Sequence, residues 1–156
     1  MQERLDPMQA NPAAYQAMIG LEQYIRQCSL EHSLVELVKI RASQLNGCAF
    51  CLHMHTSDAR ASGESEERLY LLSAWREAPL YTSRERAALA WTEALTLLAE
   101  SGAPDAEYQA AQQQFSDSEL VDLTLLIGVI NSWNRLAVGF RRPPEFNAAA
   151  LQAARG

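Results

Sequence analysis

A long apolar segment near the end of the chain constrains the fold more than any other feature. Ser116-Asp-Ser-Glu119 has the pattern of a capping box, which predicts the start of a helix. Pro143-Pro144 closes the segment, because proline does not continue a helix. A helix that is apolar on nearly every side is buried, so we expect this one in the core and also against a second subunit. The apolar residues are Val121, Leu123, Leu125, Leu126, Ile127, Val129 and Ile130.

Polar residues within the same segment argue against a membrane span. Asp122, Asn131, Asn134 and Arg135 would lie inside the bilayer, where polar groups are costly. In a soluble core they need hydrogen-bond partners. The first 16 residues lack an apolar run after a basic start, so no secretory signal is predicted. We therefore expect a cytoplasmic protein without a membrane partner.

The charge pattern and the cysteine content narrow the function classes. The formal net charge is −6, and acidic and basic residues are interleaved without a basic stripe, so nucleic-acid binding is not expected. Cytoplasmic thiols are kept reduced, and the three cysteines therefore do not indicate a disulfide scaffold. A close cysteine pair in that setting indicates metal binding or redox chemistry.

The rest of the chain is also predicted to be helical, because alanine, leucine, glutamate, glutamine and arginine dominate it. We expect an all-α bundle of six or seven helices in a single domain, 1–156. The capping box Thr82-Ser-Arg-Glu85 and the helix-stop pair Asn46-Gly47 mark two of the boundaries. The expected helices run over 12–28, from after Ser33 to Asn46, 48–63, 66–75, 82–102, 104–113 and 116–140.

The stretch "NGCAFCLHMH" contains the cysteine pair. On a helix that starts near Cys48, the side chains of Cys48, Cys51 and His55 fall within an arc of about 60°. His53 points roughly 140° away from Cys48 and is not expected in the same site. Cys51 and His55 are four residues apart, close enough to share a proton. Both cysteines lie in the first turn, where the helix dipole lowers the pKa of a thiol.

These residues outline a redox centre, but other interpretations fit the same pattern. A zinc site needs four ligands, and Cys28, His32 or water could complete a set with Cys48, Cys51 and His55. Buried core cysteines without a site are the third possibility. Glu36 is a further candidate proton carrier. Ser33-Leu-Val-Glu36 is also a capping-box pattern, and an ion pair of Glu36 with Lys39 on the surface is possible.

The complete pattern resembles a known family. Glu36, eleven residues, Cys48-Ala-Phe-Cys51, three residues and His55 are similar to the signature of the alkylhydroperoxidase D-like branch of the carboxymuconolactone decarboxylase superfamily. The stretch "INSWNRLAVGFR" resembles the same branch, and the resemblance covers a core of about 34–142. It implies an all-α fold, homo-oligomers that are commonly trimers or hexamers, and no organic cofactor or metal.

The resemblance also implies a role for each residue. Cys51 would be the thiol that attacks a hydroperoxide, and Cys48 the thiol that resolves the sulfenic acid to a disulfide. His55 would be the partner of Cys51, and Glu36 a further proton carrier. The expected function is a cytosolic thiol-dependent peroxidase that reduces small organic hydroperoxides. Its reductant would be a thiol or a lipoyl-bearing protein.

One residue departs from the family pattern. The best-known members have a histidine directly before the second cysteine, where this chain has Phe50, which carries no proton. Three alternatives to the peroxidase remain: a non-catalytic redox sensor or scaffold, a zinc-stabilised structural domain, and a carboxymuconolactone decarboxylase-like enzyme. The decarboxylase branch lacks this cysteine pair, which makes the last alternative the weakest.

Overall fold

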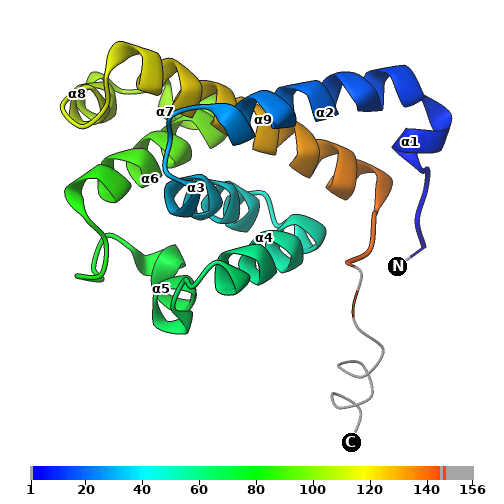
Figure 1. The fold of residues 1–156 in the computed structure, drawn as a ribbon, viewed down its shortest axis with the longest axis horizontal. Coiled ribbons are helices and arrows are strands. Elements are labelled where there is room, and N and C mark those ends of the chain that lie inside the picture. Colours follow the sequence, from blue (N-terminus) through cyan, green and yellow to red (C-terminus); the bar gives the residue numbers. More distant parts are fainter. Residues whose placement is uncertain (1, 145, 147–156) are drawn as a thin grey trace, which may run out of the picture.

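The computed structural model describes residues 2–144 and 146, and every regular element in that part of the chain is helical (Figure 1). The all-α prediction is confirmed. The predicted domain span, 1–156, includes residues 1, 145 and 147–156, which lie outside the described residues. The elements are α1 (Pro7–Ala10), α2 (Pro12–Gln27), α3 (His32–Leu45), α4 (Ala49–Ala61), α5 (Glu66–Leu71), the 3₁₀ turn η1 (Leu72–Ala74), α6 (Ser83–Thr96), α7 (Leu98–Ser101), α8 (Asp105–Gln112) and α9 (Asp117–Phe140).

The predicted number of helices, six or seven, was too low, because the described residues form nine α-helices. One addition is α1, a single turn that Asp6 caps by accepting from the N–H groups of Met8 and Gln9. The other is α7, which was expected to continue α6. Leu97 separates them with a ψ of 35°, outside the helical range. Neither one-turn helix is long enough to show apolar periodicity.

Helix α9 is the core helix of the fold. It packs against α2, α3, α4, α6 and α8, and Leu123, Leu126 and Ile130 on it are fully buried. By length and composition α9 could cross a membrane, but its apolar residues contact helices of the same chain. Two of its valines are exposed: Val121 keeps 67% of its surface accessible and Val138 keeps 48%. Most of the apolar residues of α9 are therefore buried in the core, and one side of the helix is exposed.

A tight turn between α3 and α4 positions the cysteine pair. Gly47 has a φ of +63°, a left-handed conformation that favours glycine, and it ends α3 as the sequence predicted. The N–H of Cys48 then donates to the carbonyl of Ser43 at 3.0 Å. The side-chain amide of Asn46 donates to Oδ1 of Asn131 and of Asn134, both at 2.9 Å. The turn is thus tied to the middle of α9.

Candidate active site

The two cysteines meet at the start of α4. Cys48 is the N-cap residue, and its Sγ accepts from the backbone N–H of Cys51 at 3.4 Å. The helix therefore begins one residue after the predicted position, and its first turn holds the sulfur of Cys48. Both side chains are free thiols and almost fully buried, in a cluster with Ala42, Ile130 and Ala137.

The two thiols differ in acidity. A hydrogen bond from the Cys51 thiol, together with the Cys51 N–H and the Asn134 side chain, lowers the pKa of Cys48 to about 6, against the opposing effect of burial. The same hydrogen bond and burial raise the pKa of Cys51. The expected acidification at the helix start is thus found for Cys48, and the expectation of a lowered pKa for Cys51 was wrong. The reason is that Cys48 is the N-cap residue, whose sulfur accepts a backbone N–H. Cys51 instead carries the thiol hydrogen that is donated to the Cys48 sulfur.

Polar residues from α3 and α9 lie behind the sulfurs. Asn134 is 1% exposed, and its amide donates to Oγ of Ser43 at 3.0 Å. Hydrogen bonds from Asn134 favour the ionised form of both cysteines, and Ser43 does the same for Cys51. The sequence indicated only that Asn134 needs a buried partner. Its place beside the dithiol depends on how α9 crosses α3, which no local pattern encodes.

Glu36 and His55 form a buried pair beside the dithiol. Oε2 of Glu36 lies 2.9 Å from Nδ1 of His55, and each residue is 6% exposed. Burial raises the pKa of Glu36, but the hydrogen bond and charge of His55, with the charges of Lys39 and His32, hold it below its usual range. No hydrogen bond joins His55 to Cys51 in the part of the chain that the structure describes. His55 is therefore directed to Glu36, one helical turn from the nearer sulfur.

Both simpler interpretations of Glu36 were wrong. Helix α3 begins at His32 with Glu31 as its N-cap, so Ser33 already lies in the first turn and forms no capping box with Glu36. Lys39 is buried and pairs with Glu22 on α2 rather than with Glu36 on the surface. Glu36 instead faces α4, where its partner is His55.

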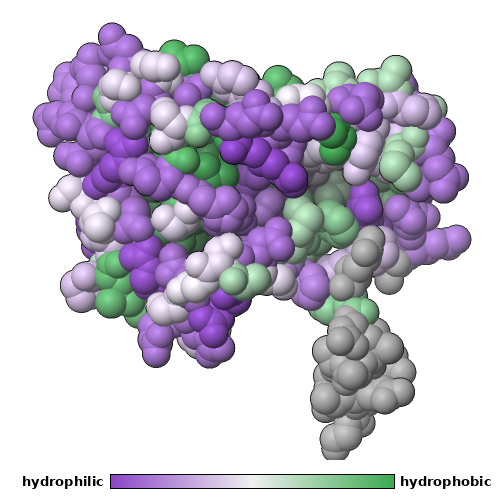
Figure 2. Space-filling view, in the orientation of Figure 1, coloured by the Kyte–Doolittle hydropathy of each residue, from purple (hydrophilic) through white to green (hydrophobic). Residues whose placement is uncertain are grey.

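A cavity of about 840 Å³ opens in front of this group, lined by α2, α3, α4 and α9. Figure 2 shows the surface hollowed between α2 and α4, with apolar residues gathered there. Cys51, His55 and Glu36 line the cavity, whereas Cys48 lies behind Cys51. The apolar part of the wall consists mainly of Tyr15, Ile19, Ile25, Leu30, Val35, Phe50, Met54, Trp133 and Leu136.

The remaining histidine and phenylalanine of the motif have separate surroundings. His53 does not line the cavity, and its ring meets the edge of Phe146 at a centroid distance of 5.0 Å. Phe50 forms part of the cavity wall, and the guanidinium of Arg142 lies 4.5 Å from the centre of its ring. Phe50 thus contributes an apolar surface to the cavity.

The zinc set considered as an alternative does not assemble. Cys28 donates its thiol hydrogen to the carbonyl of Ile25 at 3.1 Å, away from the other cysteines. Among the described residues, the one group of metal-ligating side chains close enough to share an ion is Glu36, His55 and Asp58. Neither cysteine belongs to that group, so the geometry does not support a cysteine-based zinc site.

Comparison with known proteins agrees with this architecture. A profile of the carboxymuconolactone decarboxylase family matches residues 12–94, which include Glu36, both cysteines of the pair and His55. The chain belongs to this family. An uncharacterized protein of Bacillus subtilis, YdfG, is 43% identical over 138 residues, which cover 88% of this chain and 94% of YdfG.

Solved structures place the chain in the alkylhydroperoxidase D-like branch of the family. A protein of unknown function from Agrobacterium tumefaciens, provisionally described as an antioxidant defence protein AhpD, is 46% identical. Its TM-score is 0.91, with 94% of this chain and 100% of that chain covered. An uncharacterized peroxidase-related protein from Silicibacter has the same fold at 24% identity, with a TM-score of 0.75 and coverage of 89% and 73%.

Proposed function

We propose that the protein is a thiol-dependent peroxidase that reduces small organic hydroperoxides through the Cys48–Cys51 dithiol. The observation that carries the proposal is that Cys51, His55 and Glu36 line one cavity, with the acidic Cys48 directly behind Cys51. A redox dithiol needs a reactive sulfur open to substrate, a second sulfur within reach and a nearby proton carrier. The mainly apolar wall favours hydroperoxides with a hydrocarbon group over hydrogen peroxide.

The resting pair holds one proton between its sulfurs, and the thiolate resides on Cys48. When a hydroperoxide enters the cavity, the Cys51 proton passes to Cys48 and the Cys51 sulfur attacks the terminal oxygen. The O–O bond breaks, the alcohol leaves with a proton from His55, and Cys51 becomes a sulfenic acid. Cys48 then attacks the Cys51 sulfur, and the hydroxyl group leaves as water with the Cys48 proton. The hydroperoxide is reduced to the alcohol and water, the dithiol is oxidised to a disulfide, and His55 takes a proton back from water.

Glu36 has a positioning role in this scheme. Its carboxylate fixes the Nδ1 side of His55, which leaves the rest of the imidazole facing the cavity. Phe50 takes no part in proton transfer, so His55 is the proton carrier of the motif.

A complete cycle needs a partner that reduces the disulfide. We propose that a thiol or a lipoyl-type protein is the reductant and that it acts in the cytoplasm, where the pair is kept reduced. We also propose a homo-oligomer, a trimer or hexamer, because α9 exposes Val121 and Val138 beside the core.

Free-thiol titration tests the proposed chemistry directly. One equivalent of cumene hydroperoxide should remove two of the three thiols in wild-type protein and leave Cys28. Cys28→Ser should lose two thiols in the same way, since Cys28 lies outside the pair. If wild type keeps all its thiols, or if Cys51→Ser loses as many as wild type, the dithiol mechanism is wrong.

A further inference from the structure

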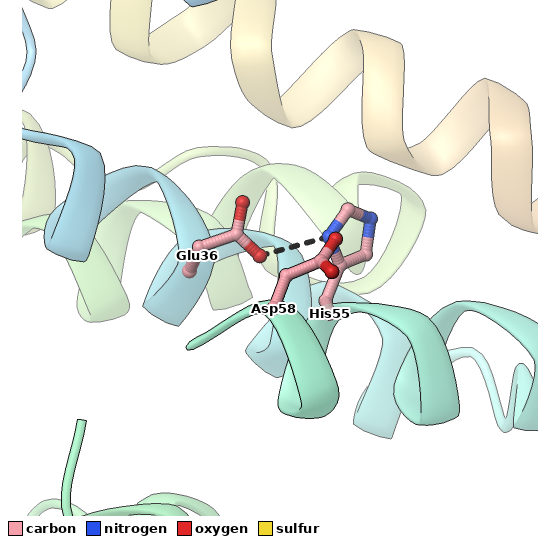
Figure 3. Close-up of side chains that lie close together, drawn as sticks. All are labelled: Glu36, His55 and Asp58. Carbon is pink, nitrogen blue, oxygen red and sulfur yellow. Dashed lines mark hydrogen bonds and ion pairs between the residues drawn. The ribbon is translucent and has the colours of Figure 1, made fainter. Parts of the chain in front are cut away.

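Three ligand-bearing side chains meet at the mouth of the cavity. Glu36 comes from α3, and His55 and Asp58 come from one face of α4, because residues three apart on a helix are neighbours (Figure 3). One ligand atom from each lies within 4.8 Å of the other two. Figure 3 shows the Asp58 carboxylate directed at the Glu36–His55 pair.

Asp58 is the residue of this group without a role in the proposed peroxidase. Its side chain forms no hydrogen bond or ion pair with any residue in the described ranges, 2–144 and 146. It is exposed, whereas Glu36 and His55 are buried. The group thus combines an exposed carboxylate at the cavity mouth with a buried carboxylate and a buried imidazole that bind each other.

The spacing suits a metal ion. Two ligands on one ion, with bonds of about 2.1 Å, lie roughly 3.0–3.4 Å apart. Oε2 of Glu36 and Nδ1 of His55 are 2.9 Å apart. These two atoms need to move apart by only a few tenths of an ångström to bind an ion in place of the proton between them. Asp58 needs a larger movement, which an exposed side chain makes at little cost. The cavity gives an entry path and room for water or another small ligand on the open side of the ion.

We propose that Glu36, His55 and Asp58 form a binding site for an exchangeable divalent transition ion. One imidazole and two carboxylates form a mixed nitrogen and oxygen donor set, which suits Zn²⁺, Co²⁺ or Fe²⁺ better than Ca²⁺. Two carboxylates with a neutral imidazole also balance the charge of a divalent ion. The ion is not a component of the thiol chemistry, for which the family resemblance implies no metal.

One consequence rests on the proposed function. An ion on Nδ1 of His55 occupies the proton carrier and separates it from Glu36, so it slows the oxidation of the dithiol. Metal binding and hydroperoxide reduction then compete for a single histidine. The binding itself does not depend on the peroxidase chemistry.

A Co²⁺ titration of the double variant Cys48→Ser and Cys51→Ser tests the site, because that variant has no dithiol to compete for the ion. Serine is a good N-cap, so the variant keeps the start of α4. We expect one Co²⁺ per chain, followed by the visible absorption of the ion and by equilibrium dialysis. Adding Asp58→Asn should weaken binding by about tenfold or more. Adding Asp105→Asn, the same change at an exposed aspartate of α8, should leave binding unchanged.

Each result decides the question. Binding that Asp58→Asn and Glu36→Gln both leave intact overturns the proposal, as does binding present in wild type but absent from the double variant, which would locate the ion on the thiols. Binding that Asp58→Asn weakens supports the metal site. If the thiols of the wild-type protein also fail to react with cumene hydroperoxide, the metal site stands and the peroxidase is rejected. Far-UV circular dichroism of each variant confirms that the helices are intact.

Discussion

Oε2 of Glu36 lies 2.9 Å from Nδ1 of His55, although 19 positions separate the two residues in the sequence. The contact joins α3 to α4, across the turn that also positions Cys48. A buried carboxylate with this partner is ionised in the folded protein, and its pKa is below its ordinary value of 4.5. The Glu36–His55 pair should therefore make the stability of the fold depend on pH, in addition to its proposed role in proton transfer.

Glu36→Gln should make that pH dependence visible. Because the folded-state pKa of Glu36 is lowered, its stabilising contribution is present above its unfolded pKa of about 4.5 and is lost as the pH falls through the folded value. The difference in unfolding free energy between wild type and Glu36→Gln should be largest near pH 7 and should shrink in acid. Urea unfolding over a pH series measures it, and a difference that grows toward low pH would contradict the assignment.

His55→Gln should slow the reaction of the dithiol with cumene hydroperoxide by a factor of roughly 10²–10⁴, the usual contribution of a positioned proton carrier. His53→Gln is the matched control, since His53 does not line the cavity and should react at the wild-type rate. Stopped-flow measurement of thiol oxidation gives both rates. Equal losses in the two variants would show that the effect is not specific to the site.

The acidity of Cys48 should depend on its neighbour. In a Cys28→Ser background, Cys48 should change from thiol to thiolate with a midpoint at about pH 6. Adding Cys51→Ala removes the donating thiol and should raise the midpoint, whereas adding Cys51→Ser keeps a hydroxyl donor and should raise it less. The ultraviolet absorbance of the thiolate follows the titration. A midpoint at the ordinary cysteine value in the Cys28→Ser protein would rule out the assigned hydrogen bonds.

Gly47→Ala should destabilise the protein by about 1–2 kcal/mol, since its positive φ is strained for any residue with a Cβ. No atom lies within 4 Å of a Cβ built at Gly47, so the loss is conformational rather than steric. Gly20→Ala is a control of opposite sign: Gly20 is helical and unobstructed, and alanine there should stabilise by about 0.5–1 kcal/mol. Thermal unfolding of the two variants should show shifts in opposite directions.

The helical fold could be predicted largely from local patterns. The capping boxes at Thr82 and Ser116 both form, with the N3 glutamate returning to the cap in each. The stop at Gly47 is also found, because a left-handed residue after a helix is a local requirement. The break at Leu97 was missed, since the residues around it favour helix and no glycine or proline marks it.

The candidate site was only partly predictable. The cysteine spacing and helix geometry placed Cys48, Cys51 and His55 on one side of α4, whereas Glu36 was supported mainly by family resemblance. Helix packing decides which side of α3 faces α4, and Ser33 gave a misleading local signal. Asp58 and Asn134 were not predicted as site residues, because an aspartate on an exposed helix face or an asparagine in an apolar helix has many ordinary explanations.

The N-cap position of Cys48 has a consequence for how the helix responds to chemistry. The atom that accepts the Cys51 N–H is also the atom whose charge changes when the thiol is protonated, alkylated or oxidised. A hydrogen bond to a charged acceptor is worth more than one to a neutral acceptor, so each of these reactions weakens the first turn of α4. Hydrogen exchange at the Cys51 amide therefore reports the chemical state of the sulfur beside it, without a chromophore or an added probe.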